Sequence, residues 1–323
     1  MKRSSRVSRR TVLRYGFGAS ALLSLPVWVP GRALGLQGAA PSERIRLGAI
    51  GIGNRGTYDL TCFLQEPDVH CVAVCDIKEA RRAAAKNMVD QRNGDTACEV
   101  YRDFRELLDR NDIDAVLIAT GPNWHATAAI TAAKAGKDVY CEKPCTKNIS
   151  QSLALAETFR RTGRVFQAGT QRRNLPHFAF AVELARRGRL GKLQAVHAHP
   201  AGLATGMSGW LPAEPEPPKE QIDWDLYLGP AAWRPFNSRL LDGFNFEKGG
   251  GMVGGGVLEW GSHCVDLCQW ANDADHTAPV EYHPPEGDRV TARYANGVEL
   301  IIRDDGWLPL GSCPVRFEGD AGW

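Results

Sequence analysis

Three side chains that can handle protons lie in one short stretch, EWGSHCVDL at 259–267. Glu259, His263 and Asp266 are spaced i, i+4 and i+7, which places them on one face of a helix. Such a face can hold a general acid or base together with the carboxylates that orient it. Glu–His pairs at this spacing are also common on exposed helices, so the spacing alone leaves a solvated helix as an equal alternative.

A glycine-rich turn, GIGNRG at 51–56, follows one apolar run and opens a helical one. Gly51 permits the tight turn, Gly53 lets the backbone approach a pyrophosphate, and Gly56 lets helix and strand pack closely. The helix start adds amide donors and the positive end of a dipole. Asp76 ends the next strand about 20 residues on, where its carboxylate can accept from a ribose 2′-hydroxyl. The pattern predicts a dinucleotide site.

The nature of the dinucleotide depends on charge near the ribose. The carboxylate of Asp76 would repel a 2′-phosphate, which favours NAD over NADP. Arg81 and Arg82 lie nearby, but the predicted helix at 78–92 is expected to turn them toward solvent.

A second reactive stretch, VYCEKPC at 139–145, places Lys143 between Cys141 and Cys145. It can be a metal or redox site of the two thiols, a solvated turn, or a site of lysine chemistry. None of the nine cysteines forms a Cys-x-x-Cys pair, so free, buried thiols are expected rather than a zinc or thioredoxin-type site. Desolvation and positive charge beside a bound nicotinamide would lower the pKa of a lysine and let it act near neutral pH.

The elements that must position these residues alternate between strand and helix up to about residue 170. Expected strands are 45–50, 70–76, 99–101, 114–120, 137–143 and 165–169, and expected helices are 55–65, 78–92, 103–109, 124–135 and 150–162. This alternation predicts an α/β Rossmann domain with a parallel, doubly wound sheet. Cofactor and substrate should meet at the carboxyl ends of its strands.

The second half predicts an α+β domain with a mostly antiparallel, open sheet. Helices are expected at 175–187 and 257–272, a strand at 193–200, and a hairpin around Asn296-Gly297, with loop-rich chain at 201–256. Because little follows the strand in PVRFEGDAGW, this domain is expected to be truncated at its C-terminus. Two alternatives stay open for the polar stretch after the last parallel strand: it reaches the site or begins a solvated helix (Gln171, Arg172 and Arg173). Four tryptophans could either stack on a sugar or lie in the core: Trp210, Trp224, Trp233 and Trp307.

The N-terminus differs from the rest of the chain in charge. Residues 1–40 hold seven basic residues and no acidic one, so the formal charge of +2 leaves a mildly acidic body with no electrostatic reason to bind nucleic acid. SRRTVLR at 8–14 precedes a weakly apolar stretch with two prolines, which predicts a twin-arginine (Tat) signal at 1–40 rather than a stable membrane anchor. The expected location is the periplasm, and the Tat translocase is an expected partner.

Taken together, these motifs resemble the glucose–fructose oxidoreductase, inositol dehydrogenase and rhizopine-catabolism (Gfo/Idh/MocA) family, in a Tat-secreted branch. The resemblance covers about residues 44–323 and rests on the glycine turn, Pro-Asn-x-His at 122–125, Glu-Lys-Pro at 142–144 and EWGSHCVD at 259–266. It implies a Rossmann domain at 41–170, a substrate and oligomerisation domain at 171–323, and a homo-oligomer formed through the second sheet if that sheet is complete.

The resemblance also assigns roles to residues. Lys143 would polarise the reacting oxygen, His263 would exchange the proton, Glu259 would orient both in place of the family's usual Asp, and Asp266 would close the motif. The residues implied to bind the dinucleotide are Gly51, Gly53, Asn54, Arg55, Gly56, Asp76, Thr120, Pro122, Asn123, His125, Glu142 and Lys143.

The expected activity is hydride transfer between NAD(P) and a secondary alcohol or ketone of a sugar or polyol. The alternatives are glycoside cleavage through transient redox and a non-catalytic sugar-binding protein that keeps its dinucleotide. His197 and His199 alternate along one strand without a third ligand, so no metal is assigned. Because free NAD is not recycled in the periplasm, an exported enzyme is expected to hold its cofactor tightly.

Overall fold

The computed structural model describes residues 40–200, 211–241, 256–287, 289–307 and 313–323. Contacts divide the chain into one unit of residues Met1–Arg44 and a second of Ile45–Trp323. Within the first unit, the described residues contain the short 3-10 helix η2 (Pro41–Glu43), and the predicted export signal otherwise lies outside the described part. In the described ranges, we find no helix with the length and apolar character needed to cross a bilayer.

The first half of the second unit builds a six-stranded sheet in the order β3-β2-β1-β4-β5-β6. All its neighbouring strands pair in parallel, as the alternating pattern predicts. The strands are β1 (Ile45–Ile50), β2 (Val69–Cys75), β3 (Glu99–Tyr101), β4 (Ala115–Ile118), β5 (Asp138–Cys141) and β6 (Phe166–Ala168). This order reverses direction between β1 and β4, and open α/β sheets bind their ligands at that switch point.

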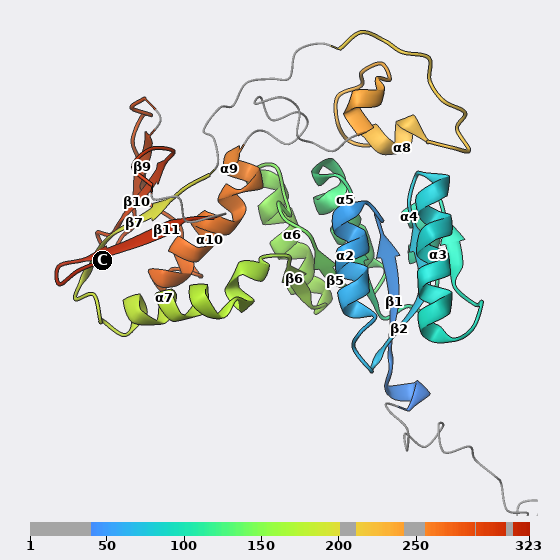
Figure 1. Cartoon of the computed structure of the whole chain (residues 1–323), viewed down its shortest axis with the longest axis horizontal. Helices are drawn as coiled ribbons and strands as arrows, with labels where there is room; N and C mark the ends of the chain where they lie inside the picture. Colours follow the sequence, from blue (N-terminus) through green and yellow to red (C-terminus); the bar gives the residue numbers. More distant parts are fainter. Residues whose placement is uncertain (1–39, 201–210, 242–255, 288, 308–312) are drawn as a thin grey trace, which may run out of the picture. The chain divides into compact units, whose positions relative to one another are not determined.

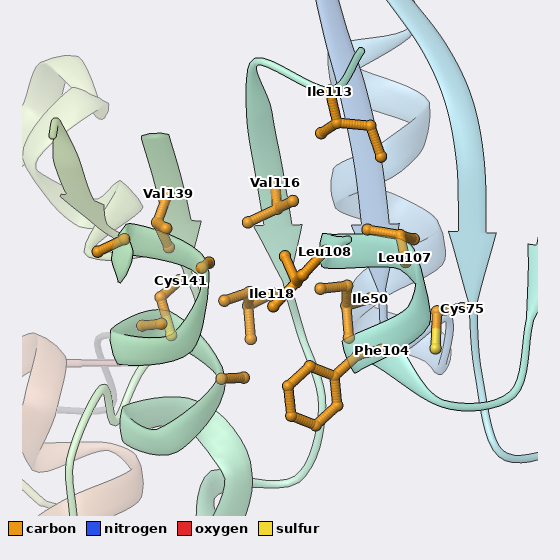
Figure 2. Close-up of a cluster of buried hydrophobic side chains, with 14 of the residues drawn as sticks. Ile50, Cys75, Phe104, Leu107, Leu108, Ile113, Val116, Ile118, Val139 and Cys141 are labelled. Carbon is orange, nitrogen blue, oxygen red and sulfur yellow. The ribbon is translucent and has the colours of Figure 1, made fainter. Parts of the chain in front are cut away.

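Helices cover both faces of this sheet (Figure 1). They are α2 (Asn54–Phe63), α3 (Glu79–Asn93), α4 (Phe104–Leu108), α5 (Pro122–Lys134) and α6 (Ile149–Thr162). Side chains along each strand alternate between the faces: Val116 and Ile118 pack with α4, α5 and α6, whereas Leu117 packs with α2 and α3. Figure 2 shows the first of these cores, in which Phe104 and Leu108 meet Ile118. Burial on both faces explains why these strands are continuously apolar.

The second half forms a five-stranded sheet in the order β11-β7-β10-β9-β8. Its strands are β7 (Leu193–Ala198), β8 (Glu281–Tyr282), β9 (Arg289–Arg293), β10 (Glu299–Arg303) and β11 (Val315–Gly319). The predicted hairpin is confirmed, because β9 and β10 pair in antiparallel fashion around a turn in which Gly297 has φ of +89°. One pair, β7 with β10, is parallel, so the sheet is mixed but mostly antiparallel.

Two helices, α7 (Pro176–Arg186) and α10 (Gly261–Ala271), share a buried core with this sheet. The predicted single helix at 257–272 is instead two helices, because α9 (Gly256–Glu259) ends before Trp260, which serves as the N-cap of α10. The remaining elements are the short helix α8 (Trp224–Leu228), which the loop-rich prediction missed, and the 3-10 helices η3 (Gln171–Asn174) and η4 (Ser238–Leu241).

Candidate active site

The glycine turn adopts a conformation that only glycine fits at two of its positions. Gly51 has φ of +85°, and a Cβ there would lie 2.5 Å from the backbone nitrogen of Thr120. A Cβ on Gly56 would lie 1.9 Å from the carbonyl oxygen of Gly51, so helix α2 packs directly against the strand end. Gly53 is the N-cap of α2, and within the described residues no side chain caps that end. The turn therefore presents bare backbone to the cleft, as a pyrophosphate requires.

Asp76 follows β2 and lies beside this turn. Its carboxylate accepts hydrogen bonds from the backbone nitrogen of Ile52 at 2.7 Å and of Lys78 at 2.8 Å. The side chain is buried yet lines the same cleft, which matches the position expected for a ribose-binding carboxylate.

The prediction that Arg81 and Arg82 face solvent is wrong. Arg81 lines the cleft, with a guanidinium nitrogen 4.0 Å from the Asp76 carboxylate and 3.3 Å from where a Cβ of Gly53 would lie. Arg82 donates to the backbone oxygen of Asp76 at 2.7 Å. Side chains at a helix start tilt back toward the N-terminus, so residues in the first turn of α3 reach over the preceding loop. Positive charge thus accompanies the carboxylate at the ribose position.

One cleft of about 710 Å³ joins the glycine turn to the residues predicted to do chemistry. Lys143, two residues beyond the end of β5, forms an ion pair with Glu259 at the end of α9. The lysine side chain is only 14% exposed, and its ion pair with Glu259 fixes where the ammonium lies. The structure thus brings Lys143, Glu259 and His263 to the lining of a single cleft.

His263 on α10 is the most perturbed of these groups. Burial lowers the pKa of its imidazole from 6.5 to about 4, with further lowering from the charges of Lys143, Arg172 and Arg55. Its Nδ1 is buried and has no hydrogen-bond partner in the part of the chain that is described. At neutral pH the ring is therefore uncharged, and it can accept a proton from a molecule bound in the cleft.

A buried carboxylate pair lies behind Lys143. The Arg55 guanidinium on α2 contacts Asp59 at 2.7 Å and Glu142 at 3.0 Å. Burial and the neighbouring Glu142 raise the pKa of Asp59 to about 6, although Arg55 opposes the rise. The second oxygen of Glu142 accepts from the backbone nitrogen of Lys143 at 3.1 Å. Arg55 and Glu142, both predicted as cofactor contacts, line the cleft but also hold the backbone from which Lys143 extends.

The Pro-Asn-x-His motif, which forms the first turn of α5, and the preceding Thr120 divide into lining and anchoring residues. Thr120, Pro122 and His125 line the cleft. The buried His125 ring lies 2.8 Å from the carbonyl oxygen of Pro144 and 3.0 Å from that of Thr120, so it bridges the loops after β4 and β5. Asn123 is not among the described lining residues; its amide donates to the backbone oxygens of Tyr227 and Leu228, both in α8, at 3.1 and 2.6 Å. These contacts give Asn123 a positioning role instead of the predicted cofactor contact.

Asp266, predicted as the last catalytic residue, is absent from the described lining. Both of its oxygens accept from Arg173 at 2.8 Å, and Arg173 also binds Asp275. This bridge ties η3 to α10, so Asp266 orients the helix that carries His263. Of the neighbours of Arg173, Gln171 and Arg172 do line the cleft.

Sequence reasoning missed three features of the site: Asp59, the anchoring of α8, and Trp260. Trp260 lies between two predicted catalytic residues and lines the cleft, whereas Trp224 is core and Trp210 lies outside the described residues. Its place in the stretch EWGSH was the available signal. His197, to which no metal was assigned, contacts Glu318 at 3.4 Å and Arg303 at 3.2 Å.

The residues present fit a dinucleotide. The two glycines leave a cradle that a Cβ would fill, the start of α2 faces the cleft, and Asp76 stands at the ribose position. For a metal, the described ranges contain no cluster of three or more His, Cys, Asp or Glu side chains suited to coordination.

Comparison with known proteins agrees with this arrangement. Residues 45–170 match the family model described as "Oxidoreductase family, NAD-binding Rossmann fold", and residues 205–306 match that described as "Oxidoreductase family, C-terminal alpha/beta domain".

Two curated relatives carry different names. A "Glycosyl hydrolase family 109 protein" of Saccharopolyspora erythraea is 34% identical over 178 residues, which are 50% of this chain and 39% of that protein. The "Myo-inositol 2-dehydrogenase" of Thermotoga maritima is 29% identical over 148 residues, or 46% of this chain and 42% of that protein. The chain thus spans less than half of the length of these relatives.

Among solved structures, GenD2 from gentamicin A biosynthesis, in complex with NAD, superimposes with a TM-score of 0.60. It is 21% identical, and the match covers 91% of this chain and 74% of GenD2. At this identity the likeness concerns the fold alone. The two family models together cover more than half of the chain, and the matched ranges contain the glycine turn at 51–56 and the EWGSHCVD stretch at 259–266. The chain therefore belongs to the Gfo/Idh/MocA family of oxidoreductases, with an NAD-binding Rossmann fold in its first half.

Proposed function

We propose that the protein is an NAD(P)-dependent oxidoreductase that transfers a hydride between nicotinamide and a secondary alcohol or ketone of a sugar or polyol. One observation carries the proposal: a single cleft is lined by the glycine turn and Asp76 and also by Lys143, Glu259 and His263. A dinucleotide-binding end and a proton-handling end are both needed for this chemistry, and neither alone would favour it.

The bound cofactor would supply the hydride chemistry, and the chain's own residues would control the substrate oxygen and its proton. The ammonium of Lys143, fixed by Glu259, donates a hydrogen bond to the substrate oxygen and favours the alkoxide character that develops on oxidation. The neutral ring of His263, which lines the cleft, accepts the hydroxyl proton at a ring nitrogen. In the reverse direction the same ring returns the proton.

The direct test is NADH formation from NAD during incubation with a panel of sugars and cyclitols. Lys143→Ala should lower kcat/KM by at least about a hundredfold, because the oxygen loses its charged donor. Arg186→Ala, which removes an ion pair with Asp273 outside the described lining, is the matched control and should leave the rate unchanged. Equal rates for Lys143→Ala and the wild-type protein would refute the assigned role.

A second candidate is compatible with the name of the S. erythraea relative. A glycosyl hydrolase built on this cleft would oxidise a ring hydroxyl transiently, eliminate the aglycone as an alcohol, add water at the carbon that the aglycone left and return the hydride, with no net change in cofactor. The distinction is cofactor demand. Product formation with accumulating NADH supports the dehydrogenase, whereas glycoside cleavage with a catalytic amount of NAD supports the hydrolase.

We also propose export through the Tat pathway with the cofactor already bound. The support is the SRRTVLR stretch at 8–14 and the need of an exported enzyme to keep its nucleotide. Protein purified from the periplasmic fraction should contain NAD that survives gel filtration, as measured by mass spectrometry of the denatured sample. Nucleotide-free periplasmic protein would contradict tight binding, and exclusively cytoplasmic protein would contradict export.

A further inference from the structure

Trp260 exposes its indole in the cleft between the two groups that would act on the substrate. The residue lies between Glu259 and Gly261, lines the cleft, and is 37% exposed. Its ring centroid is 5.9 Å from Nζ of Lys143 and 6.4 Å from the centroid of the His263 ring, to which it is tilted by 56°. The indole is therefore next to both the proposed hydrogen-bond donor and the proposed proton acceptor.

Neither packing nor helix capping accounts for a tryptophan at this position. Trp260 belongs to none of the buried clusters formed by the described residues. It is the N-cap of α10, where Ser, Thr, Asp or Asn would bond to the helix start, and no side-chain cap bond is found there among the residues described. A large apolar ring that stabilises neither the core nor its own helix is a candidate for contact with a ligand.

We propose that Trp260 is the platform on which a six-membered sugar or cyclitol ring stacks while one of its ring hydroxyls reacts. This inference rests on the proposed function and narrows its substrate class to rings that present several C–H groups on one face. A reacting oxygen about 2.9 Å from Nζ of Lys143, on the side of the indole, lies about 3–4 Å from the aromatic ring. That is the van der Waals distance at which the C–H groups of the same sugar would meet the indole face.

Charge in the cleft strengthens this arrangement. The ammonium of Lys143 faces the Trp260 ring and is attracted by its electron-rich face. C–H groups of a ring bearing several oxygens carry partial positive charge, and the same face attracts them. An open-chain polyol can reach the same donor and acceptor but offers no rigid C–H face, so it should gain little from the indole.

The test measures binding without turnover. The probes are myo-inositol and methyl α-D-galactopyranoside, with the open-chain polyol D-sorbitol as the comparison, and binding is followed by saturation-transfer NMR on the full chain with NADH present. The variants are Trp260→Phe, which keeps an aromatic face, and Trp260→Leu, which keeps apolar bulk alone. Trp233→Leu is the matched control, because Trp233 is 72% exposed and is not a described lining residue.

We expect at least one ring probe to bind the wild-type protein with saturation transferred to the C–H groups of one face. Trp260→Leu should lower the affinity for that probe about tenfold, and Trp260→Phe should keep it within about threefold of the wild-type value. Trp233→Leu should bind the probe as tightly as the wild-type protein. Sorbitol should be unaffected by any of these changes.

Three results would overturn the inference: neither ring probe binds, Trp260→Leu binds as tightly as the wild type, or Trp260→Leu weakens NADH by the same factor as the ring probe. In the last case the indole belongs to the cofactor site. Because stacking is measured without turnover, it can be present in a protein that forms no NADH, which would refute the proposed function and leave this inference standing. If Trp260→Leu forms NADH as fast as the wild-type protein, the proposed function stands and this inference is refuted.

Discussion

The pKa of His263 offers the sharpest test of the electrostatics of the cleft. The fall from 6.5 to about 4 corresponds to roughly 3 kcal/mol against the charged ring. Burial is the largest cause and the charge of Lys143 is the next, so Lys143 accounts for less than half of the fall. Lys143→Met keeps the length and apolar volume of the side chain but removes its charge. We therefore expect the pKa of His263 to rise by about one unit in this variant and to remain below 6.5.

The measurement is a histidine-ring NMR titration between about pH 3.5 and pH 8. His263→Asn assigns the resonance by its disappearance. Arg81→Met is the control for general loss of a cleft cation, because Arg81 lines the cleft but is not among the groups that lower the pKa of His263. Titration of wild-type His263 near 6.5 would refute the burial argument. An unchanged pKa in Lys143→Met would show that the ring does not sense the ammonium, and the proposed division of roles would then lose its basis.

Three further predictions concern the same cleft. A Cβ on Gly56 would lie 1.9 Å from a backbone oxygen, so Gly56→Ala should lower the melting temperature measured by calorimetry by several degrees. A Cβ on Gly53 would meet only the flexible Arg81 side chain at 3.3 Å, so Gly53→Ala should mainly weaken NADH binding, as measured by fluorescence titration. The raised pKa of Asp59, about 6, stabilises the folded state fully below pH 3.8, and this contribution is lost as the pH rises through 6. The lowered pKa of His263, about 4, acts in the opposite direction: its contribution to folding stability is full above pH 6.5 and is lost as the pH falls through 4. The two nearly cancel in the wild type between pH 7 and pH 4.5. Urea unfolding at these two pH values should therefore show Asp59→Asn losing ~2 kcal/mol more stability than the wild type on acidification and His263→Asn losing less; parallel pH profiles for all three proteins would contradict this. Arg81→Ala should weaken NADPH about tenfold more than NADH in a fluorescence titration, because its guanidinium lies beside Asp76 where a 2′-phosphate would lie; equal losses would exclude that contact.

Much of the fold and part of the site could be predicted because their signals are local. Strands buried on both faces are continuous apolar runs, and the glycine turn needs its three glycines at fixed spacing. The carboxyl ends of parallel strands share one edge, which is why Lys143 could be expected beside the dinucleotide turn before any contact was known. Its meeting with Glu259 and His263 was expected from the family resemblance, and all three side chains line one cleft.

The rest depended on partners far away in sequence. Helical spacing predicted Asp266 on the same helix face as His263. Its carboxylate instead forms an ion pair with Arg173, 93 residues earlier in the chain. Spacing likewise could not show that Asn123 would be used to hold α8, more than a hundred residues later. Arg81 was misplaced for a different reason: its side chain reaches back over the preceding loop, a direction that a helical-face pattern does not convey.

The pairing of β11 with β7 has a consequence for how the enzyme matures. Val315 pairs with Ala198 across more than a hundred residues, whereas the most distant pairing in the first sheet, that of β1 with β4, joins Leu47 to Ala115. Contacts of large sequence separation form late, and domains fold N-terminal first during synthesis. We therefore expect a nascent chain to have a folded Rossmann sheet before α10 is seated on its own sheet. Nucleotide capture and the assembly of the proton-transfer centre would then be separate events, with the cofactor able to bind before His263 is in place.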